Sequence, residues 1–391
     1  MLVENNAYTV DFRVRREAIA LRDAGYLVSV IAPRGKGECW AEHVDGIHVY
    51  RFPAPPRGRG VLGYGAEFLL ATISILLLTA YIALRRGVDV IHAGNPPDTL
   101  FVVAGLFKVA GVRFVFDQHD LSPETYLARF SSARGGPVYS ALQLMERFSY
   151  WLADVVIAPN ETYKQVAMAR GHKRPEQVFV VRNGPPLSYR PLPPEPGIVA
   201  RAPYRIGYVG TINPQDGMDR LVKAVSHMVH NLRRRDFVAV VIGDGDALQS
   251  AQELAAALGV GAFMHFTGRL GEEATRRHLS AADVCVQPDP WCALNDASTM
   301  NKLMEYMALG KPTVAFDLTE TRCSAGDSAL YAPANDEAAF ARHVCWLLDH
   351  PDERHRMGAI GRERVTRALA WEYSVPELVR AYRDGLGVCP R

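Results

Sequence analysis

Lys302 and Glu305 stand three positions apart, and their types and spacing suit the binding of a phosphorylated ligand. They lie in a stretch that reads as one helix, because Asp296 and Ser298 are N-cap residue types and Gly310 marks an end. The free N–H groups at a helix start attract phosphate, and a lysine one turn in adds charge. A carboxylate one turn further can accept hydrogen bonds from two neighbouring hydroxyls, which is the layout of a sugar nucleotide. The ordinary alternative is an ion pair on a surface helix.

Apolar runs at 282–287 and 312–316 flank this helix and are predicted to be buried strands. A helix between two parallel strands has its polar end at the rim of the sheet, where ligands bind in open α/β folds. Two polar loops, 92–98 and 117–124, also follow predicted strands. Each loop also has an interpretation without a ligand: the first as a turn with a helix cap, the second as a solvated loop.

Composition sets the broad class of the protein. The chain has 391 residues, 48% of them apolar and 22% charged, which predicts a globular protein of two domains. A formal charge of +2 without long runs of one sign argues against nucleic acid as a partner. The six cysteines are scattered, with no CxxC and no clustered histidines, so we expect a reducing compartment and no metal site. No signal peptide is evident, and we expect a cytoplasmic location.

Predicted strands and helices alternate on both sides of a proline-rich linker at 183–203. This pattern predicts two doubly wound, Rossmann-like α/β domains facing a central cleft. We place an N-terminal domain at 1–184 and a C-terminal domain at 185–370, with the last helix, 371–391, crossing back to the first domain. Residues 1–4 are predicted to be the end of a first strand, and we expect further residues upstream of it.

The most apolar run, 68–84, lies at the lower length limit for a bilayer span. Arg57 and Arg59 precede it, and Arg85 and Arg86 follow it. Three interpretations stay open: a buried helix of the fold, an interfacial helix that dips into a membrane, and a true span. We expect the helix to contact lipid without spanning the bilayer.

The sequence Glu-Tyr-Met-Ala-Leu-Gly-Lys-Pro at 305–312 resembles the donor-nucleotide signature of family 4 retaining glycosyltransferases, which have the GT-B fold. The loops 92–98 and 117–124 are similar to a subgroup that acts on bacterial polysaccharides and lipid carriers, and Val-Val-Arg-Asn-Gly at 180–184 resembles the family's hinge between its two domains. The first glutamate of the family's usual pair would fall at Ala297. This chain departs from the pattern there, and the adjacent Asp296 is the candidate substitute.

The resemblance implies transfer of a sugar from a nucleotide diphosphate donor of the UDP-N-acetylhexosamine type, with retention of configuration. It implies no cofactor, no metal and no enzymic nucleophile, since the leaving phosphate accepts the proton of the acceptor. The acceptor would be a carbohydrate or a lipid-linked polysaccharide precursor, on the inner face of the cell membrane. Many members carry Arg and Lys in the loop that corresponds to 211–217, and this chain does not, so Lys302 and then Arg269 are expected to hold the diphosphate.

The expected catalytic residues are His119, Asp120 and Lys302. The expected donor-binding residues are Gly210, Thr211, Asn213, Arg269, Asp296, Ser298, Thr299, Lys302 and Glu305. The expected acceptor-side residues are Asn5, Asn95, Asp98 and Glu124. Two other functions stay open: a sugar-nucleotide epimerase of the same fold, which needs no acceptor, and a non-catalytic membrane-associated scaffold.

Overall fold

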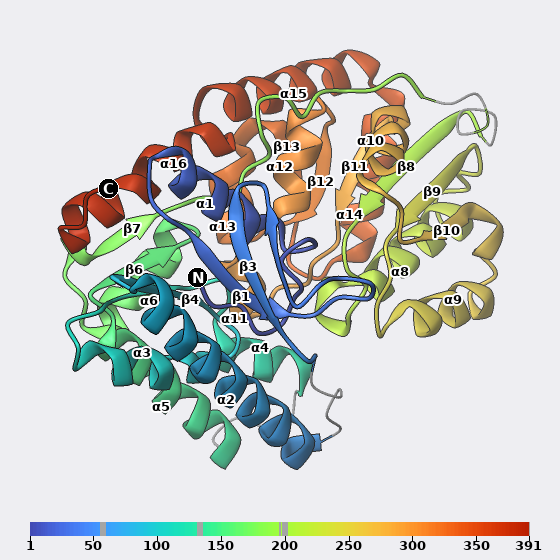
Figure 1. Cartoon of the computed structure of the whole chain (residues 1–391). Helices are drawn as coiled ribbons and strands as arrows, with labels where there is room; N and C mark the ends of the chain where they lie inside the picture. The colour runs from blue at the N-terminus through green and yellow to red at the C-terminus, as the bar shows by residue number, and fades with distance from the viewer. Residues whose placement is uncertain (55–59, 131–135, 195–196, 198–201, 391) are drawn as a thin grey trace. The chain divides into compact units, whose positions relative to one another are not determined.

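The computed structural model describes residues 1–54, 60–130, 136–194, 197 and 202–390 (Figure 1). The chain divides into two compact units, the first formed by Met1–Asn183 with Ser374–Arg391 and the second by Gly184–Tyr373. The sequence analysis places its boundaries after residues 184 and 370. Each unit has its own parallel sheet with helices on both faces, which is the doubly wound architecture predicted from the alternation of elements.

The first unit is built on strands that pair in the order β2-β3-β1 and β4-β5-β6-β7. Leu2 forms parallel bridges to both Ile31 and Ala93, so the predicted N-terminal strand joins the two groups. All described pairs are parallel except β2 with β3. The strands are β1 (Ser29–Pro33), β2 (Ala41–Val44), β3 (Ile47–Phe52), β4 (Val90–Gly94), β5 (Arg113–Asp117), β6 (Val155–Ala158) and β7 (Val178–Val180).

The helices of the first unit include two elements that the sequence analysis missed or shortened. Residues 122–129 form a helix where a loop was expected, and the apolar helix begins at Gly60 instead of residue 68. The helices are α1 (Phe12–Asp23), α2 (Gly60–Arg86), α3 (Phe101–Lys108), α4 (Ser122–Arg129), α5 (Pro137–Leu152) and α6 (Glu161–Gly171), with short 3-10 turns η1 (Asp98–Leu100) and η2 (Pro175–Gln177).

The C-terminal segment returns to the first unit from Ser374 onward, within α16 (Trp371–Arg380) and the π-helical turn η7 (Ala381–Gly385). It packs closely on β6 and β7, because a Cβ at Gly385 would lie 2.6 Å from Val155 and 2.9 Å from Phe179. Glycine at this position therefore lets the chain approach the sheet.

Helix α2 is apolar on two faces. Ala71, Ile75, Thr79 and Ile82 are buried at helical spacing, where the helix packs on β1, β3 and α3. This is the only helix of the described residues that is long and apolar enough to cross a membrane, but a separate span would not bury those residues on the sheet. The opposite face exposes large apolar side chains, namely Leu69, Leu70, Ile73, Leu77, Tyr81 and Leu84. Arg57 and Arg59 lie outside the described residues.

The sheet of the second unit has six parallel strands in the order β10-β9-β8-β11-β12-β13. The chain order reverses between β8 and β11, so the crevice at their carboxyl ends is the expected ligand position in this architecture. The strands are β8 (Tyr204–Val209), β9 (Phe237–Ile242), β10 (Met264–Gly268), β11 (Val284–Gln287), β12 (Thr313–Phe316) and β13 (Ala329–Ala332).

Side chains of these strands alternate between two apolar layers. Ile206, Val241 and Val286 face one layer with α8 and α14, while Val240 and Cys285 face the other with α10 and α12. Burial on both faces explains why the strands are continuous apolar runs. The helices are α8 (Met218–His230), α9 (Leu248–Ala257), α10 (Glu272–Ala281), α11 (Ala293–Ala297), α12 (Asn301–Ala308), α13 (Thr319–Ala325), α14 (Glu337–Asp349) and α15 (Pro351–Arg364), with turns η3 (Pro214–Asp216), η4 (Gly261–Phe263), η5 (Gly326–Ser328) and η6 (Val365–Leu369).

The prediction of one helix from Asp296 to Gly310 was wrong. Two helices, α11 and α12, meet at residues 298–300, where Ser298 and Met300 have extended backbone angles. The Ser298 hydroxyl donates to the Leu294 carbonyl 2.7 Å away, at the end of α11. Met300 is the N-cap of α12, without a side-chain cap bond, so the polar residues before it do not cap that helix.

Replacing Glu146 on α5 with glutamine is expected to stabilise the protein at alkaline pH. Burial raises the pKa of Glu146 to about 7, against a partly offsetting Arg170. The native protein thus holds this proton more tightly than the unfolded chain, and its stability falls as pH rises from about 4.5 to about 7. At ~1.4 kcal/mol per pKa unit, the variant gains up to about 3 kcal/mol at pH 8 and almost nothing at pH 4.5. Urea unfolding at both pH values, with exposed Glu253→Gln as control, measures this; an equal gain at both contradicts it.

Candidate active site

Lys302 in the second unit lies at the switch point of the sheet, paired with Asp289. Its Nζ is 2.8 Å from Asp289 Oδ1, and both side chains are almost fully buried. Asp289 comes two residues after β11, and Lys302 is the second residue of α12. The carboxylate holds the pKa of Lys302 above its usual range in spite of burial, so the ammonium group stays charged.

The end of β8 forms the other wall around Lys302. Its ammonium group lies 5.0 Å from the Tyr208 ring centroid, and a Cβ at Gly210 would lie 3.8 Å from its Cδ. Gly210 has φ +155°, and its N–H donates to Ile242. Gly217, with φ +72°, lets the loop pass so close to Pro288 that a Cβ would meet its carbonyl oxygen at 2.0 Å. Glycines thus bring both strand ends next to the lysine.

Glu305 and Arg269 complete the charged residues that were expected on the donor side. Glu305 lies one turn after Lys302 on α12 and is partly exposed. Arg269 directly follows β10 and is exposed, with no ion-pair partner among the residues that the structure describes. Both therefore belong to the carboxyl-end rim of the second sheet, and their binding of phosphate and hydroxyl groups stays a prediction.

The other expected donor-side residues mostly serve local structure. Both carboxylate oxygens of Asp296 accept hydrogen bonds from Thr319, at 2.8 and 3.0 Å, at the start of α13. Thr299 donates to Glu320 at 3.1 Å. Asn213 starts the short turn η3, while Thr211 is exposed and accepts a bond from Tyr208 through its carbonyl. With Asp296 engaged in this way, nothing in the geometry makes it the substitute for the family's first glutamate.

Both the ring and the backbone of His119, in the first unit, have hydrogen-bond partners. Its Nε2 lies 2.5 Å from Asp117 Oδ2, and its backbone N–H donates to Asn95 Oδ1 at 2.7 Å. Asn95 also accepts from the backbone N–H of Asp120 at 3.2 Å and donates to the Asp120 carbonyl at 2.8 Å. The loops after β4 and β5, both predicted as substrate loops, are thus joined through Asn95 at the carboxyl edge of the sheet.

The remaining first-unit candidates differ in exposure. Asp120 is half-buried, and burial raises its pKa while His119 lowers it. Asp98 is buried, and burial raises its pKa to about 6 although it accepts a bond from Asn95. Glu124 is buried and paired with Arg170 on α6, so it joins helices instead of facing an acceptor. Asn5 is exposed after the N-terminal bridge.

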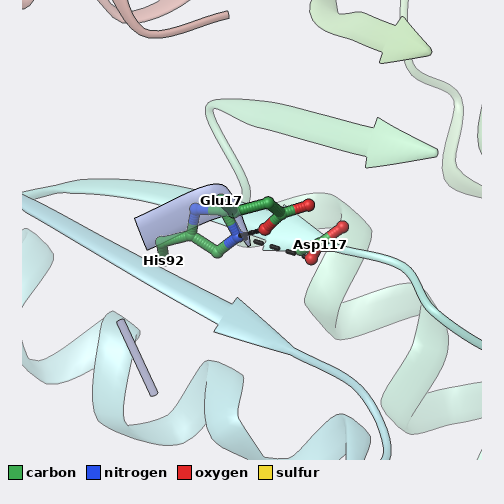
Figure 2. A group of neighbouring side chains, drawn as sticks. All are labelled: Glu17, His92 and Asp117. Carbon is green, nitrogen blue, oxygen red and sulfur yellow. Dashed lines mark ion pairs between the residues drawn. The ribbon is translucent and has the colours of Figure 1, made fainter. Parts of the chain in front are cut away.

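Behind His119 lies a buried cluster of Glu17, His92 and Asp117 (Figure 2). His92 Nε2 is 3.4 Å from Glu17 and 3.5 Å from Asp117, so the three residues have the ligand types and spacing of a metal site. Arg13, however, donates to both oxygens of Asp117 and lies 3.1 Å from Glu17. The guanidinium group already supplies the positive charge that a metal would provide.

Sequence analysis missed Asp289, Asp117 and Arg13 as site residues. Asp117 is the last residue of β5 and Asp289 comes two residues after β11, so both carry the signal that identified the loops after the strands. Arg13 gave no such signal, because it lies on α1, more than a hundred residues from Asp117 in sequence. The C-terminal Tyr382, whose hydroxyl is 2.8 Å from His92 Nδ1, gave none either.

Comparison with known families agrees with this architecture. The model "Glycosyl transferase 4-like domain" matches residues 10–184, and "Glycosyl transferases group 1" matches residues 203–350. Together the two matched ranges leave out only the linker and the ends of the chain. The chain belongs to glycosyltransferase family 4 and has the GT-B fold.

Three known proteins resemble this chain, one in sequence and two in fold. D-inositol 3-phosphate glycosyltransferase of Thermomonospora curvata is 31% identical over 191 residues, which is 46% of this chain but only 43% of that protein's length. Sucrose-phosphate synthase of Thermosynechococcus elongatus superposes with a TM-score of 0.77 at 19% identity, covering 96% of this chain and 93% of that one. HepE of Anabaena, solved with UDP-glucose, has a TM-score of 0.71 at 16% identity and covers 98% of both chains.

Proposed function

We propose that the protein transfers a sugar from a nucleotide diphosphate donor to a carbohydrate or lipid-linked acceptor, with retention of configuration. The observation that carries the proposal is the placement of Lys302 at the switch point of the second sheet with Glu305 one turn behind it. A buried, charged lysine suits a diphosphate, and a partly exposed carboxylate suits the ribose hydroxyls. Family membership makes sugar transfer the reaction that this ligand would serve.

A uridine donor is the preferred form of this proposal. The structure of HepE, which shares the fold, contains UDP-glucose. An N-acetylhexosamine as the sugar rests on the resemblance of the loops 92–98 and 117–124 to the polysaccharide and lipid-carrier subgroup. We propose no metal or cofactor, because the ammonium group of Lys302 and the guanidinium of Arg269 can balance the leaving diphosphate.

In this mechanism the protein stabilises charge that develops on the leaving diphosphate. The ammonium group of Lys302 has three N–H donors, one of which is directed at Asp289, and it also lies beside Tyr208. Because the lysine is buried and fixed, these donors need little reorganisation as the glycosidic bond breaks. We propose that the leaving phosphate then accepts the proton of the acceptor hydroxyl on the same face of the sugar, which gives retention.

Titration with nucleoside diphosphates tests the donor site through Glu305. Two shielded hydrogen bonds from the ribose diol to a carboxylate are worth roughly 1.5–3 kcal/mol each and are not additive. Glu305→Ala is therefore expected to weaken UDP binding about 10- to 100-fold. Glu305→Gln should weaken it less, because the amide oxygen still accepts one bond. Calorimetry measures the affinities, and circular dichroism checks the fold.

A 2′,3′-dideoxy nucleotide is the matched ligand control for Glu305. It should bind wild type and Glu305→Ala almost equally, because it lacks the hydroxyls that the carboxylate would hold. If the variant still prefers the ribose form by the wild-type factor, the diol lies elsewhere and the donor placement fails.

The products distinguish transfer from the two alternatives. A transferase consumes the nucleotide sugar and releases the nucleoside diphosphate in step with an acceptor. An epimerase would convert the nucleotide sugar without an acceptor, and a scaffold would do neither. Incubation of UDP-N-acetylglucosamine with and without membrane extract, followed by chromatography and nuclear magnetic resonance of the products, separates the three and reports the anomeric configuration.

We further propose that α2 lies on a membrane surface, which would bring a lipid-linked acceptor to the enzyme. Besides the exposed stripe of α2, the neighbouring helices expose large apolar side chains, namely Val102 and Leu106 on α3, Val109 directly after it, and Leu144, Phe148 and Trp151 on α5. Arg85, Arg86 and Arg147 are exposed beside them. A broad apolar surface with basic residues at its border suits an anionic bilayer.

Replacing Leu69, Ile73 and Leu77 with glutamine is expected to weaken vesicle binding about 100-fold. Each side chain would lose about 1 kcal/mol of burial in lipid. Cosedimentation with phosphatidylglycerol vesicles measures this, with a triple replacement of the exposed Leu27, Leu187 and Leu232 as control. High salt should release part of the wild-type protein. A wild-type protein that does not bind vesicles at low salt, or that resists carbonate extraction from cell membranes, would contradict the proposed position of α2 on the membrane surface.

A further inference from the structure

Asp117 is a fully buried carboxylate that accepts hydrogen bonds from Arg13 and lies beside His119, while His92 Nε2 is 3.5 Å away. Arg13 donates to it through Nη2 at 2.7 Å and through Nε at 3.2 Å, one bond to each oxygen. The oxygen that accepts from Nε also lies 2.5 Å from His119 Nε2. Arg13 is itself anchored, because its Nη1 donates to the Val181 carbonyl at 3.1 Å, just after β7.

The charge state of Asp117 decides which way its bond to His119 runs. Burial alone would raise the pKa of Asp117, but Arg13 and His119 hold it well below its usual range. An ionised carboxylate only accepts hydrogen bonds, so Nε2 of His119 must carry the proton and donate. In the neutral ring, Nδ1 is then the acceptor nitrogen, and no hydrogen bond from the described residues occupies it.

Neighbouring atoms restrict the orientation of the His119 ring. Its backbone N–H is fixed by Asn95, as is that of the next residue. On the sheet side, a Cβ at Gly94 would lie 2.9 Å from the Cε1 of the ring, so only glycine leaves room for it. The side chain keeps 19% of its surface exposed, which leaves it reachable for a ligand.

Glu17, beside Asp117, is a second buried carboxyl group next to Arg13, and its pKa is shifted in the opposite direction. It is also fully buried and lies 3.1 Å from Arg13 Nη2. Burial, then the charge of Asp117, raises the pKa of Glu17 well above the usual range, which favours its neutral form. Of the two carboxyl groups beside Arg13, Asp117 is the one that lies within hydrogen-bond distance of His119.

We propose that Asp117, anchored by Arg13, is a positioning residue that holds His119 with its proton on Nε2 and thereby offers Nδ1 as an acceptor to a hydroxyl of the sugar being transferred. The contact with sugar rests on the proposed function. The orientation and tautomer of the ring do not, since they follow from contacts inside the first unit.

Nitrogen-15 spectra of the imidazole rings test the tautomer without any donor or acceptor. The protein has 12 histidines, and comparison with His119→Gln identifies the His119 signals. In the neutral ring of the wild type we expect the proton on Nε2. In Asp117→Asn the single amide oxygen is expected to stay with Arg13, so the NH2 group faces His119 and the proton moves to Nδ1.

Turnover gives the second measurement. We expect Asp117→Asn to lower kcat about 100-fold or more while the affinity for UDP stays within about twofold. Glu17→Gln is the matched control, because it replaces the neutral carboxyl group by a neutral amide and should keep both the tautomer and kcat. Circular dichroism checks that each variant folds.

Two outcomes overturn the proposal: a wild-type His119 protonated on Nδ1, or an Asp117→Asn variant that folds and keeps the wild-type tautomer. If Asp117→Asn does not fold, the wild-type spectrum alone still decides the first of these. A protein with the expected tautomer that transfers no sugar would refute the proposed function and leave the Asp117–His119 arrangement intact.

Discussion

Lys302→Ala is expected to lower kcat by about 100- to 1,000-fold, the effect of removing one fixed donor from a developing negative charge. The affinity for nucleoside diphosphate should also fall, because the same ammonium group would hold the diphosphate in the ground state. Glu305→Ala should differ in kind, with most of its effect on affinity. Steady-state kinetics at saturating donor, combined with calorimetry, separates the two contributions.

The buried partner of Lys302 provides the control. Removing the lysine alone leaves Asp289 buried without its cation, which costs about 3–5 kcal/mol of stability in comparable pairs. The double variant Lys302→Met with Asp289→Asn removes both charges and should fold better, yet remain as slow as Lys302→Ala. Asp289→Asn alone removes the carboxylate that keeps the pKa of the buried lysine high, so its affinity for diphosphate should fall as pH rises. If the double variant regains wild-type kcat, the lysine does not serve the leaving group.

His119→Ala is expected to lower kcat about 100-fold and to leave UDP affinity almost unchanged. His119 belongs to the first unit, whereas the residues proposed to hold the nucleotide belong to the second. A contact with the sugar that tightens only in the transition state affects turnover more than donor binding. Asp120→Ala should also lower kcat more than it weakens UDP binding, but to a smaller extent. Among the described residues, Asp117 fixes the ring of His119, whereas no hydrogen bond fixes the side chain of Asp120.

The exposed His355 on α15 is the control for loss of a histidine, and His355→Ala should behave as wild type. The measurement is kcat at saturating donor together with the dissociation constant of UDP. A His119→Ala protein that binds UDP more weakly but keeps its kcat would indicate that His119 contacts the nucleotide instead of the sugar.

Local pattern was enough to predict most of the strands and helices. Strands buried on both faces, such as β9 and β11, are continuous apolar runs, and the helices between them repeat apolar residues every three to four positions. Gly217 stands where a loop passes close to another backbone. The alternation of these patterns predicted the α/β class, and the signature at 305–312 pointed to the family that the comparisons then showed.

Helix boundaries near the site were less predictable, because long-range hydrogen bonds decide them. Asp296 has the side chain of an N-cap, but its oxygens go to Thr319, more than twenty residues away in sequence. Ser298 bonds back to Leu294 and closes α11 before α12 begins. Nothing in the local sequence distinguishes a cap from these uses of the same side chains.

The sequence by itself determined which residue types stand at or just after the ends of the strands, namely Asn95, Asp117, His119 and Asp289, and that Lys302 stands near the start of a helix. Only the tertiary structure decided which of them work together. Arg13 reaches Asp117 because α1 lies against the sheet, and Tyr382 reaches His92 because the C-terminal segment returns to the first unit. Hydrogen bonds and ion pairs act over about 3 Å in space, whatever the separation along the chain. Partners a hundred or more residues apart therefore leave no periodicity or spacing that a single sequence could reveal.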